Sequence, residues 1–424
     1  MPNVILVRGA RQLLTLRGPS GPRRGPDLRN LGLIQDGAVL VVDGVIREVG
    51  PSRRIENLAL ARKADEIDAS GCVVMPGFVD SCSHLASGPA RLFDYDMILA
   101  GASASEITKA GGGVIGLARS VQELSFRTLK ALALRTLEEA VRHGTTAMEA
   151  RSGFGLTEAG EIKILRVHSS FRDLPVLVIS TLLCARIAPG YERRQDEYID
   201  WVCSHLLPLV KRRKLAEFAA VRFEPGGLSA VQVNRYIAAA RGLGLAIRVQ
   251  SCPGLDDVAI SYAVDTGAVS VDDLTQPNER AIARLADSNV VATLLPGTAF
   301  YAGSGHFPPA RRLIDRGVAV CLASGYHTES SPSQNMQMAI ALACSWMRMT
   351  PAEAISASTI NAAHAIGRAA QTGSLEVGKR ADLVIFSVPD YREIPYHFGV
   401  GLVDMTMAAG EILVRRPEVR WPAD

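Results

Sequence analysis

The sequence has no apolar run that approaches the roughly 20 residues needed to cross a membrane as a helix. Its seven cysteines are an odd number and are widely spread, so that no two of them form a Cys-x-x-Cys pair. No secretory signal precedes them. This pattern predicts a reducing, cytoplasmic compartment. The net charge of +3 is too small to favour nucleic acid or an acidic membrane surface as a partner.

The composition is that of an ordinary soluble globular protein. The chain has 424 residues, of which 48% are hydrophobic and 21% are charged, and it contains 38 glycines. This length allows one large barrel with an accessory part, or two to three domains. No internal repeat or low-complexity tract is evident. A large α/β enzyme fold is therefore the natural expectation.

The stretch over residues 75–85 combines an apolar strand with reactive side chains. Its apolar residues are interrupted by Pro76-Gly77, and it ends in the polar run that contains Asp80, Cys82 and His84. A buried parallel strand presents catalytic or ligand groups at its carboxyl end in this way. We therefore expect these three side chains to lie at a site.

Short apolar segments alternate with amphipathic helical segments from Gly77 onward, about eight times over roughly 250 residues, which is what a (β/α)8 barrel requires. One helix is expected over residues 121–143, where leucines and valines recur near helical spacing and Gly144 follows as a stop. The later strands are expected over residues 145–149, 177–183, 215–223, 245–250, 269–274, 290–295 and 318–323. The predicted fold class is α/β, with a TIM-type barrel.

Both ends of the chain favour β-structure. Residues 3–7 and 38–49 are strand-like, and Asp43-Gly44 within the second segment is a hairpin signal. Towards the other end, strand-like segments cover residues 381–386, 402–407 and 411–414. We therefore expect a small antiparallel sheet at the N-terminus and further strands at the C-terminus.

Several segments, taken together, resemble imidazolonepropionases, a branch of the amidohydrolase superfamily that opens a five-membered cyclic amide. The opening strand matches the superfamily pattern Pro-Gly-aliphatic-aliphatic-Asp-x-His-x-His, except that Cys82 replaces the first histidine. The Gly-Gly-Gly and Ser-Gly-Phe-Gly-Leu segments are more particular to this branch. The similar segments span nearly the whole chain and cover residues 110–113, 143–149, 151–156, 292–297, 359–363, 373–384 and 389–396.

The resemblance implies how the two β-rich ends are arranged. They pair with each other and form one small composite β-sandwich domain, made of residues 1–74 and 375–424. Residues 75–374 form the barrel. The resemblance also implies a homodimer.

The resemblance further implies a metal site with altered ligands. In the family, the metal acidifies water and polarises a carbonyl group, and it is held by two histidines after the first strand, a later histidine and an aspartate at the last strand. Matched by position, Cys82 replaces the first histidine and His84 keeps the second. Gln250 replaces the third histidine, and Gly325 has no side chain at the aspartate position.

The family's catalytic and substrate-binding positions are also partly changed. The catalytic histidine corresponds to Asp273, and a substrate-binding histidine corresponds to Arg186. Arg91 matches the substrate-binding arginine, and Phe154 keeps the ring but not the hydroxyl of the family's tyrosine. These four residues are the expected catalytic and substrate-binding groups.

Three interpretations of Cys82 are open. Zinc accepts thiolate, imidazole and carboxylate, so Cys82, His84, Asp273 and His327 are chemically acceptable ligands for a rebuilt zinc or iron site, with Gln250 as a poor ligand beside them. Cys82 could instead be a nucleophile with His84 as its base, because residues two apart on a strand face the same side. The simplest interpretation is a small buried side chain that fills a vacant ligand position.

Two arginines allow opposite interpretations as well. If Arg91 and Arg186 both face the barrel mouth, they form a positive pocket suited to a carboxylate or a phosphate. Alternatively, each arginine pairs with a nearby acid, such as Asp94 or Glu224.

Five changed positions at once indicate a lost function. We therefore expect an imidazolonepropionase-like protein without metal-dependent ring opening and without a cofactor, which binds an anionic small molecule. One alternative is an active hydrolase of cyclic amides that uses zinc or iron at an atypical site. Another is a non-catalytic partner subunit of an active paralogue. Neither nucleic acid nor a membrane is an expected partner.

Overall fold

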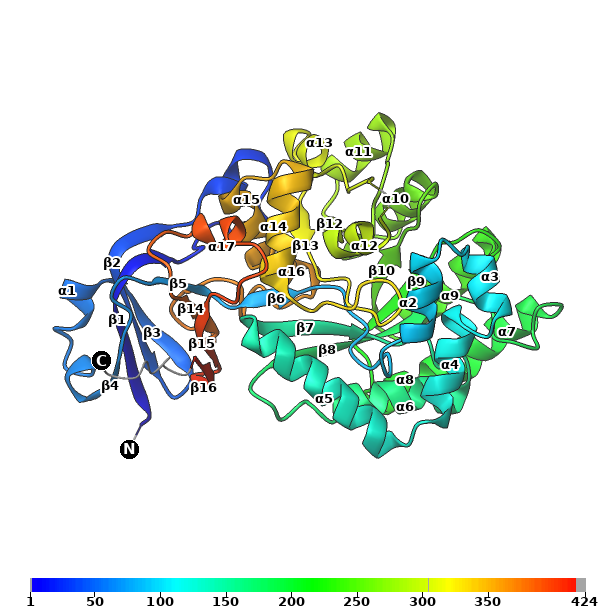
Figure 1. Ribbon diagram of the computed structural model, residues 1–424, viewed down its shortest axis with the longest axis horizontal. Coiled ribbons are helices and arrows are strands. Elements are labelled where there is room, and N and C mark those ends of the chain that lie inside the picture. The colour runs from blue at the N-terminus through cyan, green and yellow to red at the C-terminus, as the bar shows by residue number, and fades with distance from the viewer. Residues whose placement is uncertain (1, 304, 417–424) are drawn as a thin grey trace.

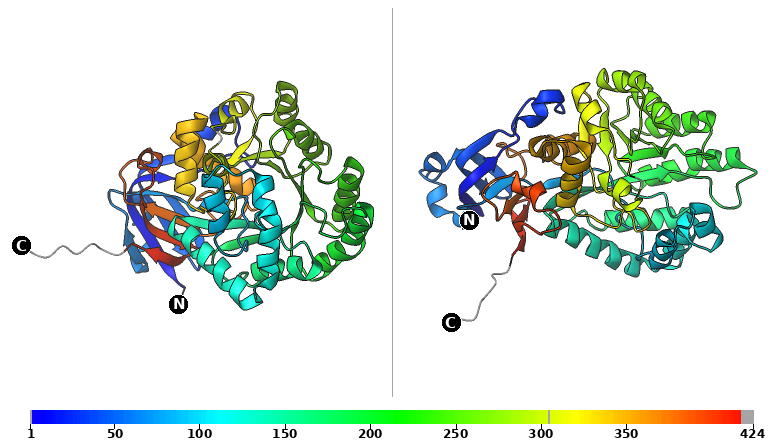
Figure 2. Two further views of the ribbon diagram at one scale, coloured as in Figure 1. Left: turned by 45° about the vertical axis from the view of Figure 1, so that its right-hand side comes forward. Right: turned by 45° about the horizontal axis from the view of Figure 1, so that its top comes forward.

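The computed structural model describes residues 2–303 and 305–416, which form a barrel and a separate sheet built from both ends of the chain (Figure 1). In the barrel sheet, eight strands follow one another in sequence order, and each hydrogen-bonded pair of neighbours is parallel. Helices cover the outside of this sheet when the molecule is seen from two further directions (Figure 2). The predicted (β/α)8 barrel is confirmed.

The barrel strands are short and almost wholly buried, as expected for parallel strands covered on both faces. They are β6 (Phe78–Asp80), β7 (Thr145–Arg151), β8 (Leu177–Cys184), β9 (Phe218–Arg222), β10 (Ala246–Gln250), β11 (Ser270–Asp272), β12 (Val291–Leu294) and β13 (Val320–Leu322). Each overlaps a segment that the sequence predicts as a strand.

Several helices around the barrel bury an apolar face, as α5 shows. In α5 the buried residues include Leu129, Ala133, Leu137 and Ala140, which recur at helical spacing. The α-helices are α1 (Ser52–Ile55), α2 (Leu92–Leu99), α3 (Ala104–Lys109), α4 (Gly113–Glu123), α5 (Phe126–Arg142), α6 (Glu158–Ser169), α7 (Gln195–Trp201), α8 (Leu207–Arg212), α9 (Ala230–Gly242), α10 (Asp256–Asp265), α11 (Glu279–Ala286), α12 (Pro296–Tyr301), α13 (Ala310–Asp315), α14 (Met336–Met347), α15 (Pro351–Ala357), α16 (Ile360–Ala365) and α17 (Glu393–Tyr396).

The single helix predicted over residues 121–143 is wrong at its start. Two helices, α4 and α5, meet at Leu124, whose backbone is extended. The hydroxyl of Ser125 accepts a hydrogen bond from the backbone N–H of Thr128 and begins α5. The apolar spacing continues across this break, so periodicity alone did not reveal the cap.

The seam between the first and last barrel strands is closed by loop residues beyond the strand ends. The N–H of Gly325 donates to the carbonyl oxygen of Cys82 at 3.1 Å, and the N–H of His84 donates to the carbonyl oxygen of Tyr326 at 2.8 Å. Both loops therefore lie side by side at the carboxyl end of the barrel.

The second sheet joins strands from both ends of the chain, as predicted, but its N-terminal part is mixed and not purely antiparallel, because β1 pairs in parallel with β4 and β5. Its order is β16-β15-β14-β5-β1-β2-β3, with β4 paired to β1. Apolar side chains from both ends of the chain form one shared core on this sheet. Its strands are β1 (Val4–Leu14), β2 (Leu33–Val42), β3 (Val45–Pro51), β4 (Asp65–Asp68), β5 (Val73–Pro76), β14 (Leu383–Phe386), β15 (Val403–Ala408) and β16 (Glu411–Arg415). Residues 417–424, at the end of the predicted sandwich domain, lie outside the described part.

The apolar stretch that opens the barrel belongs to two sheets. Strand β5 pairs with β1 and β14 in the terminal sheet, whereas β6 pairs with β7 in the barrel. Gly77 separates them, and a Cβ there would lie 2.3 Å from side-chain atoms of Thr146. The chain therefore passes from one sheet to the other at a point where only glycine fits.

None of the helices formed by residues 2–303 and 305–416 is both long enough and apolar enough to cross a membrane.

Candidate functional site

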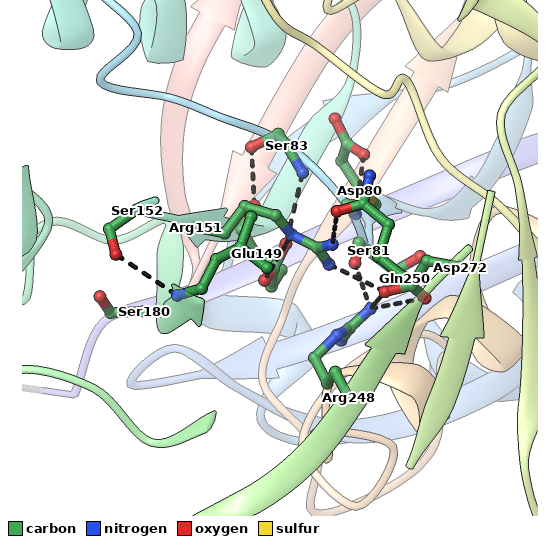
Figure 3. A network of polar contacts seen from close by, with 12 residues as sticks. Asp80, Ser81, Ser83, Glu149, Arg151, Ser152, Ser180, Arg248, Gln250 and Asp272 are labelled. Carbon is green, nitrogen blue, oxygen red and sulfur yellow. Dashed lines mark hydrogen bonds and ion pairs between the residues drawn. The ribbon is translucent and has the colours of Figure 1, made fainter. Parts of the chain in front are cut away.

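The barrel strands bring a set of polar side chains together at their carboxyl ends (Figure 3). Asp80, Arg151, Gln250 and Asp272 are each the last residue of their strand, respectively β6, β7, β10 and β11. Parallel barrel strands aim such terminal side chains at one mouth. This is the place where the site was expected.

The guanidinium of Arg151 lies among the other polar groups. Its Nε donates to the two carboxylate oxygens of Glu149 at 3.2 and 3.1 Å. Its Nη1 donates to Oε1 of Gln250 at 3.4 Å, and its Nη2 donates to Oδ2 of Asp272 at 3.0 Å. Burial alone would lower the pKa of the Arg151 guanidinium, but the charges around it, those of Glu149 and Asp272 among them, raise that pKa well above its usual value.

A second buried arginine, Arg248, binds the same aspartate from β10. Its Nη2 lies 3.2 Å from Oδ1 of Asp272 and donates to the carbonyl oxygen of Ser81 at 2.8 Å, while Nη1 donates to the carbonyl oxygen of Ala365 at 2.7 Å. Burial acts to raise the pKa of Asp272, but Arg248 and Arg151 outweigh it and hold this pKa below its ordinary value. Asp272 is therefore a carboxylate between two cations.

Asp80 serves the barrel seam. It accepts hydrogen bonds from the backbone N–H of Ser324 at 3.0 Å and from the Ser324 hydroxyl. Burial raises the pKa of Asp80 to about 6, and the bonds from Ser324 oppose that rise. This carboxyl group thus links the first strand to the last.

Cys82 packs as an apolar side chain. It is 2% exposed and forms a small cluster with Leu295 and Ala323. Burial raises the pKa of its thiol well above the ordinary value, whereas a nucleophilic cysteine needs a lowered pKa. The geometry favours the interpretation of Cys82 as a filler of the vacant ligand position.

His84 and His327 do come together, with Phe154 against both. The two imidazole centroids are 4.9 Å apart, and the Phe154 ring lies 4.6 Å from His84 and 4.5 Å from His327. Nδ1 of His84 and Nε2 of His327 are buried and have no hydrogen-bond partner. Burial lowers the pKa of both rings, that of His327 to about 3, so both are neutral near pH 7.

Asp273 lies just beyond β11 in a left-handed backbone conformation, with φ of 67°, which aspartate tolerates better than most residues. Burial raises the pKa of its carboxyl group to about 6. Gln250, another residue predicted to bind metal, accepts a hydrogen bond from Nη1 of Arg151 through Oε1.

The donor set does not fit a metal ion. Structural and catalytic zinc sites use three or four protein ligands. Among residues 2–303 and 305–416, no group of three or more histidines, cysteines, aspartates and glutamates is arranged to hold a metal. Gly325, with φ of 62°, supplies no side chain at the fourth family position.

The two predicted substrate-binding arginines are paired with acids. Nε of Arg91 lies 3.1 Å from Oδ2 of Asp94, and Nε of Arg186 lies 2.8 Å from Oε1 of Glu224. The interpretation that each arginine pairs with a nearby acid is confirmed. Arg222, at the end of β9, is a weaker partner of Glu224 at 3.8 Å, and its buried Nε has no hydrogen-bond partner.

Sequence reasoning missed Arg151, Arg248 and Arg222 as site residues. A signal was present, because Arg151 stands two residues after Glu149 and Arg248 stands two residues before Gln250, each pair within an otherwise apolar strand. Residues two apart on a strand face the same side. Charged residues in such pairs therefore indicate a polar barrel interior.

Comparisons with known proteins concern the whole chain. The model of the amidohydrolase family matches residues 73–413. The chain is 40% identical over 420 residues to an imidazolonepropionase of Geobacillus kaustophilus, with 98% of this chain and 99% of that protein covered. It is 37% identical over 423 residues to an imidazolonepropionase of Symbiobacterium thermophilum, with 99% of each protein covered.

Solved structures share the fold at lower sequence identity. Guanine deaminase of E. coli matches with a TM-score of 0.73 at 17% identity, over 98% of this chain and 100% of that one. A zinc-bound adenosine deaminase from Xanthomonas campestris matches with a TM-score of 0.68 at 18% identity, over 96% of this chain and 92% of that one. These likenesses concern the architecture alone.

Proposed function

The chain belongs to the amidohydrolase family, and on this premise we propose that it binds a small molecule at the barrel mouth without metal-dependent ring opening. The donor set carries this proposal. Of the four family ligand positions, only that of His84 keeps its family residue. Cys82 packs among apolar side chains and Gln250 accepts a bond from Arg151. Gly325 has no donor.

Electrostatics supports the same conclusion. Arg151 contacts Gln250 directly. Its positive charge lowers the pKa of the Cys82 thiol, which burial raises, and lowers the pKa of His84, which burial lowers as well. Three of the family ligand positions therefore face a fixed cation. The carboxylates of Glu149 and Asp272 are bound to guanidinium groups, so neither is a free ligand for a divalent ion.

The proposed ligand is a small polar molecule with an anionic group. The buried ring nitrogens His84 Nδ1 and His327 Nε2 have no hydrogen-bond partner, and the Phe154 ring packs against both imidazoles. Arg222 has a buried Nε that makes no hydrogen bond and lies 3.8 Å from Glu224, and the Arg186 side chain is 39% exposed although it pairs with Glu224. Arginine forks recognise carboxylates and phosphates.

The alternative is an active hydrolase, which is what the names of the relatives describe. Elemental analysis of protein purified without chelator, combined with an assay of ring opening on a five-membered cyclic amide, separates the two. We expect metal far below one ion per chain and no turnover. Stoichiometric zinc or iron, lost together with activity in His84→Ala but not in His143→Ala, would overturn the proposal.

Ligand binding is tested by thermal shift with a panel of small carboxylates, phosphates and cyclic amides. A ligand should raise the melting temperature of the parent and of Arg142→Gln, an exposed control, but not that of Arg222→Gln. If no member of the panel raises the melting temperature of the parent, the binding function is wrong.

The compartment and the assembly belong to the same proposal. All seven cysteines are free, which supports a reducing cytoplasm. We propose a homodimer, with neither nucleic acid nor a membrane as partner, and light scattering on the purified protein gives its mass. A monomer that becomes a stable heteromer with an active paralogue would favour the role of a partner subunit.

A further inference from the structure

Four charged side chains at the centre of the barrel are joined by ion pairs and have no solvent exposure, while the buried carboxyl group of Asp80 is bonded separately to Ser324. The four are the cations Arg151 and Arg248 and the carboxylates Glu149 and Asp272, whose side chains are all 0% exposed. Their formal charges cancel. A balanced set of this kind avoids the high cost of an unpaired buried charge.

Arg151 connects strands that are not neighbours. It belongs to β7, whereas Asp272 belongs to β11 and Gln250 to β10, and β8 and β9 lie between β7 and β10 along the sheet. The guanidinium therefore reaches across the barrel interior (Figure 3). It also holds Glu149 on its own strand.

The guanidinium of Arg151 occupies a position in which it can replace a bound metal ion structurally. It neutralises buried carboxylates and ties several strand ends to one positive centre, as a divalent ion does through its ligands. Its place is also that of the lost site, because Gln250 is in direct contact with it and Cys82 and His84 lie within reach of its charge.

We propose that Arg151 is the resident cation of this barrel, which holds the ends of β7, β10 and β11 together and keeps divalent metal ions out of the site. This inference rests on the proposed metal-free function. Under this inference, Arg151 excludes metal ions through its own charge and contacts, and the missing ligands contribute separately.

Removal of Arg151 alone leaves Glu149 buried without its cation and Asp272 with Arg248 alone. The site then has an excess negative charge next to His84 and Cys82. Such a site favours a divalent cation, which the parent does not.

The experiment compares Arg151→Met with the charge-balanced variant Arg151→Met/Glu149→Gln and with Arg142→Met, which alters an exposed arginine. An amide at position 149 keeps an acceptor for the N–H of Ser83, which bonds Glu149 at 3.3 Å. Melting temperatures are measured without metal and with CoCl2, and visible absorption reports bound Co2+. Arg151→Lys, which restores the charge, is measured in parallel.

We expect Arg151→Met to melt roughly 5–10 °C below the parent, to regain part of this loss with CoCl2 and to show Co2+ absorption bands. The double variant should melt between the two and should not respond to CoCl2. Arg151→Lys restores the charge but not the three separate N–H contacts, so it should melt between Arg151→Met and the parent and show no Co2+ absorption. If Arg151→Met is recovered only unfolded, its refolding yield with and without CoCl2 replaces the melting temperature.

Two results overturn the inference. Equal stability of Arg151→Met and the double variant would show that charge balance is not the role of Arg151. Indifference of Arg151→Met to Co2+ would show that Arg151 does not exclude metal. Stoichiometric metal in the parent instead overturns the proposed function, so the two failures are distinguishable.

Discussion

Glu161 holds the loop that carries Phe154 to the site, and its replacement by glutamine should loosen that loop. Its carboxylate, on α6, accepts hydrogen bonds from the backbone N–H groups of Gly153 at 2.8 Å, Gly155 at 2.7 Å and Leu156 at 3.0 Å. The side chain is buried, and burial raises the pKa of Glu161 although these bonds oppose the rise. One carboxylate thus satisfies three otherwise unpaired loop donors.

The expected loss of stability follows from these bonds. A glutamine retains one acceptor oxygen, so the bond from Gly153 is lost and its N–H faces an amide N–H instead. A bond to a charged group contributes about 1.5–3 kcal/mol, and the remaining two bonds weaken when the charge is removed. We expect Glu161→Gln to lower the free energy of unfolding by about 3 kcal/mol.

The matched control is Glu158→Gln, one turn earlier on α6. Glu158 is exposed and pairs with His205, which is also exposed, so this change should cost less than about 1 kcal/mol. Urea midpoints followed by circular dichroism measure both effects, and hydrogen exchange of the amides of residues 153–156 localises the first. Equal midpoints for the two variants, or unchanged exchange in that loop, would refute the role given to Glu161.

Three other changes test separate features. Burial lowers the pKa of His168 to about 3 from an ordinary 6.5, so its contribution to the free energy of unfolding falls by about 1.4 kcal/mol per pH unit as pH drops below 6.5. His84 and His327 add contributions of the same sign, so urea midpoints of His168→Gln should keep an acid slope that is smaller by the share of one histidine. The buried thiol of Cys82 should resist iodoacetamide at about pH 8 until urea unfolds the chain, and labelling of the folded protein would favour the nucleophile. Gly77→Ala places a Cβ against Thr146 and should cost about 1–3 kcal/mol, measured by thermal melting, whereas Gly21→Ala, which meets open space, should cost far less.

The sequence predicts the barrel well because each strand is a local apolar run. The predicted strand over residues 245–250, for example, became β10 with a change of one residue at its start. The break before α5 was not predicted, since it depends on a single capping hydroxyl at Ser125.

The centre of the site was harder to predict because its contacts join distant parts of the chain. Arg151 and Asp272 are 121 positions apart, and no local pattern states that they meet. The altered ligand positions were visible by resemblance at Cys82 and Gln250. The position of the Arg151 guanidinium beside them was visible only in the structure.

The second sheet, which joins both ends of the chain, cannot complete its strand pairing until nearly the whole chain has been synthesised. Strand β5 has β1 on one side and β14 on the other, with Pro76 opposite Leu383. During synthesis at roughly 5–20 residues per second, the ribosome needs on the order of 15–60 s to pass from one partner to the other. Throughout that interval one edge of β5 has open hydrogen-bonding groups, and the barrel is completed before this edge is covered. The nascent chain therefore exposes an aggregation-prone strand edge, which a chaperone or rapid formation of the barrel must protect.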